Sequence, residues 1–332
     1  MAKQVAKRVA KQEEEVVEPG LDWRALADSP PASADELHAW VRQHMGVVIA
    51  RSSLIGGHSP PFAYIVHSFF EGRAALAERE ATASTDSVVW ANRGGGKTLL
   101  GAIATALDLI FKPEIEVRIL AGSMDQSKRM HAHLRRLFAP EHGSLHTLVK
   151  KLTDTKLTLV NGSAVELLAQ SQTSVRGTRV QKLRCDEVDL FSRDIWDAAQ
   201  LTTRSKQCGA FAVRGSVDCL STMHNPHGVM HDLVAEAREG DRALFKWGVV
   251  DVLEHCGDEY TCGGCPLHVE CEGKAKTRAS KDAGHVSVRD AIDMKRRVAL
   301  TVWESEMLCT RPKRSDCVLP EFDFRTHVLQ DS

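Results

Sequence analysis

The sequence predicts an α/β fold with a mainly parallel central sheet flanked by helices. Short apolar runs of strand type recur from Ser87 onward, and segments with helical periodicity separate them. An Asn161-Gly162 pair between two further apolar runs is the signature of a tight hairpin. Strands that alternate with helices are joined by crossovers, so we expect them to run parallel and to be covered on both faces.

The expected elements follow in chain order. Ser33 with Glu36 is a capping box for a short helix that continues through Val41. Strands are expected at residues 87–91, 117–121, on both sides of the turn within 157–167, at 180–186, and once or twice within 210–222. Helices are expected at residues 98–111 and after Ser123, whose side chain can cap a helix carrying Met130, Leu134 and Leu137.

Composition and charge narrow the class of protein. The chain has 332 residues, of which 43% are hydrophobic and 26% are charged, as in an ordinary globular protein. No apolar run approaches the ~20 residues that cross a bilayer, and the first residues lack the apolar core of a secretion signal, so a cytosolic protein is expected. Because the formal net charge is -1, contact with nucleic acid would need a local basic stripe.

The strongest local signal is a glycine-rich loop between an expected strand and an expected helix. It consists of Asn92, Arg93, Gly94, Gly95, Gly96, Lys97 and Thr98. Glycines let backbone N–H groups point inward around a triphosphate, and the following helix adds the partial positive charge of its N-terminus. In this P-loop (Walker A) pattern, Lys97 is expected to bridge the β- and γ-phosphates, and the Thr98 hydroxyl is expected to hold Mg²⁺.

One position departs from the usual P-loop pattern, because Ala91 stands where the first glycine is expected. Arg93 then lies inside the loop, where its guanidinium can neutralise charge on the transferred phosphoryl group, as an arginine finger does. The loop therefore predicts an ATP site in which Arg93 and Lys97 stabilise the charge of the transition state.

Two adjacent carboxylates end the strand expected at residues 180–186. Asp186 is expected to bind Mg²⁺, and Glu187, one residue beyond the strand, to polarise the attacking water. Lys182 and Arg184 interrupt the apolar run expected of a central buried strand, which counts against this interpretation. The spacing favours it, because the pair follows the phosphate loop by about 90 residues within the alternating pattern.

Ser221 and Thr222 end a later expected strand. Small hydroxyl residues at such a place can sense the γ-phosphate and pass its loss on to a neighbouring element. An ordinary junction between a strand and a turn would have the same sequence, so without further support this role is one of two equal interpretations.

Together these motifs resemble the ATPase domain of phage terminase large subunits, which is a P-loop NTPase of the ASCE type. The resemblance covers about residues 60–250, and it consists of the variant loop at residues 92–98, an Arg176-Gly177 step, the acidic pair, and the Ser221-Thr222 segment. It implies that Arg93 is catalytic and that Ser221 and Thr222 couple ATP hydrolysis to movement.

The resemblance also implies a biological role. The family hydrolyses ATP with Mg²⁺ and drives double-stranded DNA into a viral procapsid, as a homo-oligomeric ring on the portal protein, with a small terminase subunit that selects viral DNA. The expected location is the host cytoplasm, transiently at the portal vertex. Full-length members carry a second, nuclease domain, but only 12 residues follow Pro320, so nuclease activity is not expected from this chain.

Two other functions fit parts of the sequence. The run from Asp186 to Asp189 matches a DEAD-box-like acidic motif, so a helicase or translocase is the first alternative, although such enzymes need a second motor domain. The second alternative is a nucleic-acid-binding module with an inactive phosphate loop.

Four of the nine cysteines form a cluster with the spacing of metal ligands: Cys256, Cys262, Cys265 and Cys271. An odd count without a secretion signal argues against disulfides, so either Zn²⁺ or a [4Fe–4S] cluster is expected here. The run from Cys262 to Cys271 resembles the iron–sulfur loop of helix-hairpin-helix DNA glycosylases, with a first spacing that is one residue shorter.

The remaining cysteines and the basic residues near the cluster have simpler interpretations. The five scattered cysteines are expected to be mostly small buried apolar residues, namely Cys185, Cys208, Cys219, Cys309 and Cys317. The basic residues Lys274, Lys276, Arg278 and Lys281 either face DNA phosphates or form a solvated face.

These observations divide the chain into four stretches. Residues 1–32 are expected to be a charged, flexible N-terminal arm, and residues 33–250 the P-loop ATPase domain. Residues 251–312 are expected to form a Cys-rich metal-binding and linker subdomain, and residues 313–332 the start of a linker toward a nuclease domain that the chain does not contain.

Overall fold

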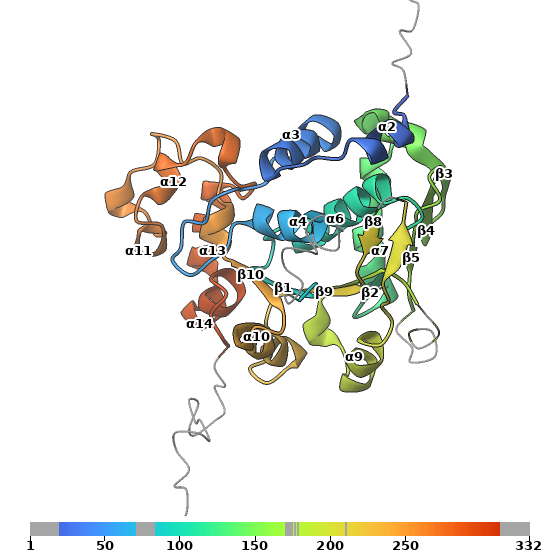
Figure 1. Cartoon of the computed structure of the whole chain (residues 1–332). Coiled ribbons are helices and arrows are strands. Elements are labelled where there is room, and N and C mark those ends of the chain that lie inside the picture. The colour runs from blue at the N-terminus through green and yellow to red at the C-terminus, as the bar shows by residue number, and fades with distance from the viewer. Residues whose placement is uncertain are drawn as a thin grey trace, which may run out of the picture.

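A twisted central sheet with helices on both faces dominates the computed structural model, which describes residues 20–70, 84–169, 175, 177, 179–209 and 211–312 (Figure 1). Within these residues the sheet has eight strands in the order β10-β1-β9-β6-β2-β5-β4-β3. The strands are β1 (Ser87–Ala91), β2 (Glu116–Ala121), β3 (Val149–Leu152), β4 (Lys156–Leu159), β5 (Ala164–Leu167), β6 (Lys182–Asp186), β9 (Ser216–Ser221) and β10 (Ala243–Trp247). A separate antiparallel pair consists of β7 (Lys206–Cys208) and β8 (Phe211–Val213).

The pairing of the strands confirms the predicted α/β class. The six strands from β10 to β5 in this order pair in parallel, and β4 and β3 extend the sheet in antiparallel fashion. Strand β9 lies between β1, which precedes the glycine loop, and β6, which ends in the acidic pair. This arrangement fits the predicted α/β fold of P-loop NTPases. It brings the carboxyl ends of β1, β9 and β6 together at one edge of the sheet.

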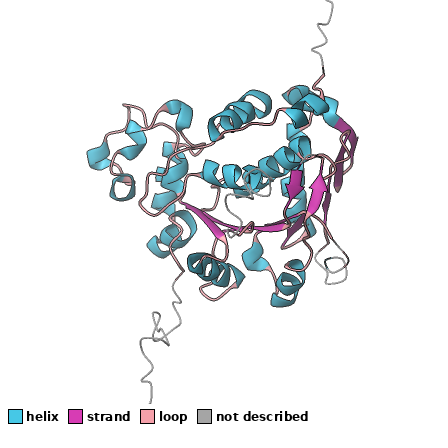
Figure 2. Cartoon of the chain, in the orientation of Figure 1, coloured by secondary structure: helices cyan, strands magenta, loops and turns pink. Residues whose placement is uncertain are grey.

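Helices cover the two faces because successive strand side chains point to opposite sides. On one face Val89 packs in a core with α4 (Pro61–Phe70), α6 (Lys97–Phe111) and α7 (Met124–Leu137). On the other face Val88 and Trp90 pack with α9 (Arg193–Ala199) and α10 (Val229–Glu239). Figure 2 shows the strands enclosed between these two helical layers. Because both faces of the sheet are covered, every residue of the central strands β1, β6 and β9 is buried.

Among the described residues, two helices precede α4. In α3 (Ala34–Met45) the predicted cap is present, because the Ser33 hydroxyl accepts a hydrogen bond from the N–H of Glu36 at 3.2 Å. The Glu36 carboxylate accepts a hydrogen bond from the N–H of Ala32 instead of that of Ser33. The second hydrogen bond of the capping box therefore forms one residue earlier than expected. Helix α2 (Trp23–Asp28) lies in the stretch predicted as a flexible arm, and residues 1–19 lie outside the described residues.

The predicted hairpin is confirmed. Strands β4 and β5 pair antiparallel on either side of Asn161-Gly162, and Gly162 has φ +85°, a left-handed conformation that favours glycine. The Asn161 amide also donates to the carbonyls of Leu109 and Ile110 at 2.8 and 3.3 Å, so it satisfies the last turn of α6. The turn therefore ties the hairpin to the helix that follows the phosphate loop.

The charged residues of β6 do not prevent it from being a central strand, contrary to the objection raised by the sequence. Arg184 is fully buried and forms ion pairs with Asp108 of α6 and Asp218 of β9, which are buried as well. Lys182 is also buried and donates to the Ser216 hydroxyl at 2.7 Å. Buried charges are tolerated when partners of opposite charge surround them.

Residues 249–312 form a small unit with its own apolar cluster, which includes Leu253, Leu267, Ile292 and Trp303. Its helices are η4 (Val249–Val252), η5 (Cys262–Gly264), α11 (His268–Cys271), α12 (Lys274–Thr277), η6 (Ser280–Asp282), α13 (Val288–Arg297), α14 (Leu300–Val302) and the π-helical turn η7 (Trp303–Met307). Figure 1 shows α11 to α14 beside the β10 edge of the sheet. The proposed boundary at residue 251 remains a prediction.

Three short 3₁₀ turns complete the described structure: η1 (Pro140–His142), η2 (Ser144–Leu148) and η3 (Val188–Leu190). No helix among the described residues is both long and apolar enough to cross a membrane. Four of the five scattered cysteines, Cys185, Cys208, Cys219 and Cys309, are buried as predicted, and Cys317 lies outside the described residues.

Candidate nucleotide-binding site

The glycine loop has the concave shape that the sequence predicts. It leaves β1 at Ala91 and enters α6 at Lys97, and both Gly94 and Gly96 adopt left-handed φ values of +74° and +83°. A Cβ at Gly95 would lie 2.3 Å from the Asn92 side-chain oxygen and 2.9 Å from the Asn92 carbonyl. Glycine is therefore needed at Gly95 for close packing and at its two neighbours for backbone conformation.

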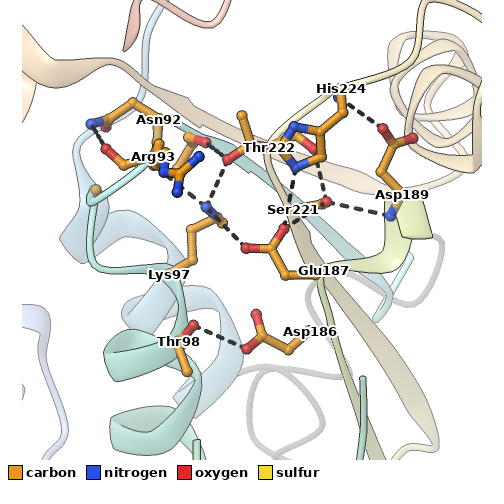
Figure 3. Close-up of polar contacts among 12 residues, drawn as sticks. Asn92, Arg93, Lys97, Thr98, Asp186, Glu187, Asp189, Ser221, Thr222 and His224 are labelled. Atoms are coloured by element: carbon orange, nitrogen blue, oxygen red, sulfur yellow. Dashed lines mark hydrogen bonds and ion pairs between the residues drawn. The ribbon is translucent and has the colours of Figure 1, made fainter. Parts of the chain in front are cut away.

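Lys97 points from the first turn of α6 into the centre of the site. Its Nζ donates to the Thr222 hydroxyl at 2.8 Å and to the Asn92 carbonyl at 3.4 Å, and it lies 3.7 Å from Glu187 Oε1 (Figure 3). The lysine is buried, with 6% of the residue exposed, so its charge acts in a region with little solvent screening. These partners hold the ammonium beside the N-terminus of α6, where a phosphate would bind.

Thr98 and Asp186 lie together, as expected of a magnesium site. The Thr98 hydroxyl donates to Asp186 Oδ2 at 3.0 Å, whereas Asp186 Oδ1 is buried and finds no hydrogen-bond partner among the described residues. Burial, together with the charge of Glu187, raises the pKa of Asp186 to about 6. An unpaired carboxylate oxygen beside a hydroxyl fits the oxygen ligands that Mg²⁺ prefers.

Glu187 stands at the carboxyl end of β6 in a left-handed conformation with φ +53°, which is uncommon for a residue with a side chain. Its carboxylate lies between Lys97 and His224, at 3.7 Å from a nitrogen of each, and Ser221 Oγ is 3.3 Å away. Burial works to raise the pKa of Glu187, but His224 and Lys97 together hold it below its usual value. The side chain is thus ionised and suited to accept a proton from water.

Ser221 and Thr222 contact both charged groups of the site. The Thr222 hydroxyl accepts from Lys97 and donates to the Ala91 carbonyl at 3.0 Å. The Ser221 hydroxyl lies 2.8 Å from the Thr222 carbonyl and 3.3 Å from Glu187, and its single proton serves one of these acceptors at a time. The end of β9 therefore has the contacts that a coupling element needs.

A cleft of ≈ 510 Å³ opens in front of these groups, within the usual size range of ligand pockets. Its lining includes Arg93, Lys97, Thr98, Glu187, Thr222 and His224. The Arg93 side chain is exposed, and the backbone N–H of Arg93 donates to the Glu306 carbonyl at 2.9 Å. All the predicted residues from Asn92 to Thr98, with the acidic pair and the hydroxyl pair, are thus brought to one place.

The structure adds contacts around the site that the sequence did not predict. Asp189 accepts hydrogen bonds from the N–H groups of His224 and Asn225 at 2.8 and 2.9 Å, so the last acid of the DEAD-like run braces the segment after β9. His224 Nδ1 bonds to Glu306 Oε1 at 2.9 Å. Neither His224 nor Glu306 lies in a recognisable motif, and only the position of His224 directly after the coupling segment could have drawn attention to it.

Helix α7 also contributes to the cleft through Gln126, Arg129 and His133. Their spacing places them on one side of the helix, away from the buried Met130 and Leu134. The helical period visible in the sequence could have identified this second face. Of the Arg-Gly step predicted upstream, Gly177 is described and Arg176 lies outside the described residues.

The four clustered cysteines line one small cavity of ≈ 20 Å³ in the C-terminal unit, and all four are free thiols. Burial raises the pKa of the Cys256 thiol, and the nearby thiol of Cys271 adds to this rise against the charge of Lys276. Within the described part of the chain, however, no group of three or more His, Cys, Asp or Glu side chains is arranged so that it could hold a metal ion. The metal site predicted from the spacing therefore remains a prediction.

The basic residues after the cluster do not form one exposed face. Arg278 is buried and donates to the carbonyls of Asp251 and Ser52, both at 2.8 Å, so the interpretation of this residue as a DNA contact is wrong. Its role is structural, because it ties the C-terminal unit to the segment before α4. Lys274 and Lys276 pair with Glu272 and Asp258, and the side chain of Lys281 lies outside the described residues.

Comparison with known proteins gives matches in structure only. No protein-family model and no curated protein sequence matches the chain. The large terminase of a thermophilic bacteriophage has a TM-score of 0.50 and 11% identity, covering 80% of this chain and 57% of that one. The same terminase in complex with ADP gives 0.50 and 12%, covering 80% and 56%. The HK97 bacteriophage large terminase gives 0.50 and 14%, covering 81% and 55%.

These matches are informative about architecture. The chain spans 55% to 57% of the length of these terminases. Sequence identities of 11% to 14% support a shared fold without fixing the residues of a shared activity. The described chain therefore has the fold of phage large terminases over the part that it matches.

Proposed function

We propose that this chain is the ATP-hydrolysing motor of a phage DNA-packaging terminase. The observation that carries the proposal is that Lys97, Thr98 and Glu187 line one cleft, with Asp186 hydrogen-bonded to Thr98 beside it, where two parallel strands separated by a third end. The fold shared with the large terminases of the thermophilic bacteriophage and of HK97, the first of which binds ADP, agrees with it. The alternative functions considered for the sequence have no comparable support.

The chemistry follows from the positions of the side chains. Thr98 and Asp186 are the residues that would hold Mg²⁺, which when bound neutralises charge on the phosphates. Lys97 exchanges its contacts with Thr222 and Glu187 for the β- and γ-phosphates, close to the N-terminus of α6. Glu187 orients the attacking water and takes its proton, and Arg93 stabilises the charge that develops on the γ-phosphate.

The same geometry suggests how hydrolysis moves the chain. While the γ-phosphate is bound, Lys97 is drawn away from the Thr222 hydroxyl and from Glu187, which the Ser221 hydroxyl also contacts. Loss of the phosphate returns Lys97 to Thr222. Because β9 ends at Ser221, and Thr222 leads directly into the segment braced by Asp189, this exchange reaches the surface beyond the sheet.

A steady-state ATPase assay tests the activity directly. We expect Glu187→Gln to lower kcat by about 100-fold or more while labelled ATP still binds, because the carboxylate acts on water and not on the nucleotide. We expect Lys97→Ala to lose binding of labelled ATP. Glu239→Gln, at the exposed end of α10, is the matched control and keeps wild-type turnover. Absence of turnover by the wild-type chain, with and without DNA and portal protein, would sink the proposal.

The assembly belongs to the same proposal. We assign double-stranded DNA as the translocated substrate, with the portal protein and a small terminase subunit as partners, a homo-oligomeric ring as the working form, and the portal vertex in the host cytoplasm as its place. The shared fold supports this assignment. Co-purification with a portal protein, and higher ATP turnover in the bound fraction, are the expected results. Unwinding of duplex DNA by the chain alone would indicate a helicase instead.

We further propose that the thiols of Cys256, Cys262, Cys265 and Cys271 bind Zn²⁺ or a [4Fe–4S] cluster. Their common cavity and free thiols support the proposal. Elemental analysis of the purified chain distinguishes the two, since a cluster adds iron, sulfide and colour. Loss of the metal in Cys262→Ser, with unchanged content in Cys208→Ser, is the expected result, whereas a metal-free wild-type protein would contradict it.

A further inference from the structure

His224 occupies a position that the proposed mechanism does not yet use. Its backbone N–H is fixed by Asp189 Oδ2 at 2.8 Å, so the imidazole projects from a braced segment into the mouth of the cleft. Nε2 lies 3.7 Å from Glu187 Oε2, and Nδ1 lies 2.9 Å from Glu306 Oε1. Figure 3 shows the ring of His224 over the carboxylate of Glu187. The histidine thus bridges the acidic residue of the site to η7 at the end of the described chain.

The charged groups around the His224 imidazole determine its protonation state. The Glu187 and Glu306 carboxylates raise the pKa of His224 to about 9, so the ring is an imidazolium near neutral pH. The other positively charged residues that line the same cleft are Lys97, Arg93 and Arg129, and the first two act on Glu306 as well. Glu187 therefore has two cationic partners, Lys97 on one oxygen and His224 on the other.

Nucleotide binding is expected to remove the contact of Glu187 with Lys97 and to keep its contact with His224. The phosphates compete for Lys97, so Glu187 loses that contact at the moment at which it must point at water. A glutamate side chain that loses a partner regains rotamer freedom. His224 keeps its place, because Asp189 holds its backbone and Glu306 holds its ring.

We propose that His224 is a positioning residue that holds the Glu187 carboxylate toward the attacking water, and that Glu306 holds His224. The inference rests on the proposed ATPase activity and deepens it. It also links the site to the C-terminal turn η7, because the Glu306 carbonyl accepts the N–H of Arg93 at 2.9 Å while its side chain bonds to His224. One residue of η7 thereby touches both the phosphate loop and the positioning residue.

Kinetics on five variants, one of them a double variant, test the proposal. His224→Ala is expected to lower kcat by about tenfold or more with the KM for ATP and the binding of a labelled, non-hydrolysable ATP analogue changed less than about twofold. His224→Gln keeps a donor that can reach Glu187 and is expected to recover part of the loss. Glu306→Gln is expected to lower kcat in the wild-type background and to have no further effect in the His224→Ala background. His227→Ala is the matched control from the same loop, whose ring lies against His231.

The outcomes separate this inference from the function on which it rests. One outcome would contradict the positioning role and leave the proposed ATPase activity intact. In that outcome the wild-type chain hydrolyses ATP, Glu187→Gln is inactive, and His224→Ala keeps its kcat within about twofold. A rise in KM at constant kcat would make His224 a binding residue and overturn the inference. Equal effects of Glu306→Gln with and without His224 would break the link to η7. A wild-type chain without turnover would remove both proposals together.

Discussion

Removal of Arg184 is expected to destabilise the fold strongly. It is fully buried between the acidic side chains of Asp108 and Asp218, and Tyr64 Oη lies 3.5 Å from its guanidinium. Arg184→Ala leaves two carboxylates without their shared cation, although Asp108 retains Lys112 at 2.5 Å. We expect the free energy of unfolding in urea to fall by about 3–5 kcal/mol, the usual cost of breaking a buried ion pair from one side.

A matched control comes from the surface. Arg135 pairs with Asp154 at 2.8 Å, but its side chain is 51% exposed and that of Asp154 is 85% exposed. Solvent screens such a pair, so Arg135→Ala is expected to change the free energy of unfolding by no more than about 0.5 kcal/mol. Equal losses in the two arginine variants would mean that the buried network of Arg184 contributes nothing specific.

The contrast between Lys97 and His224 shows which residues a sequence can reveal. Lys97 follows three glycines at the start of a helix, so local spacing alone predicts its direction and its ligand. His224 acquires its partners from Glu187 and Glu306, and the second of these lies 82 residues away along the chain. No periodicity or motif encodes such a contact. The objection that Arg184 would not fit a central buried strand was wrong for the same reason, since its ion-pair partners come from two other elements.

Helix α4 carries a histidine that should make stability depend on pH. His67 packs against Phe245 with ring centroids 5.3 Å apart, and its Nε2 is buried with no hydrogen-bond partner in the described structure. Burial, with the charge of Lys182, lowers the pKa of His67 to about 4, below the ordinary 6.5. The unfolded chain therefore binds this proton more readily than the folded one, so stability is fully present above pH 6.5 and is lost as the pH falls toward 4.

The size of this loss follows from the same two pKa values. Between pH 7 and pH 5 the wild-type protein is expected to lose about 2 kcal/mol more of its free energy of unfolding than His67→Leu, which cannot titrate at this position. Urea unfolding of both proteins at the two pH values gives the difference directly, and other titrating groups cancel in the comparison. Parallel losses in the two proteins would show that His67 is not held neutral by the fold.

Most elements of the sheet could be predicted because their signals are local. The strand at Ser87–Ala91 and the helix capped by Ser123 have the expected positions, and Asn161-Gly162 marks the hairpin. The order of the strands in the sheet has no local signal, because it depends on which faces of distant elements pack together. Nothing in the run Ser216–Ser221 shows that this strand lies between β1 and β6, although that insertion is what brings Thr222 to Lys97.

The C-terminal unit reaches the phosphate loop at separate points, which no pattern in the sequence indicates. His285 Nε2 lies 3.0 Å from the Gly94 carbonyl, 191 residues apart along the chain. The Arg93 N–H donates to the Glu306 carbonyl at 2.9 Å. Both contacts use backbone atoms of the loop. Because every residue has these atoms, such contacts cannot be predicted from the residue types of the loop. The loop is thus held from outside the sheet by residues of two distant turns.

This arrangement predicts that nucleotide binding stabilises more than the loop. Ligand that binds only the folded state suppresses opening of the elements that form its site, by about 2.7 kcal/mol at 100 times the Kd. In hydrogen exchange with ADP and Mg²⁺ we expect slower exchange not only at residues 92–98 but also at residues 284–286 and 303–309. Helix α2 (Trp23–Asp28), which does not line the cleft, serves as the internal control and should exchange at an unchanged rate. Lys97→Ala under the same conditions should show none of these changes. Protection confined to residues 92–98 would mean that the C-terminal unit only rests on the loop and does not respond to its ligand.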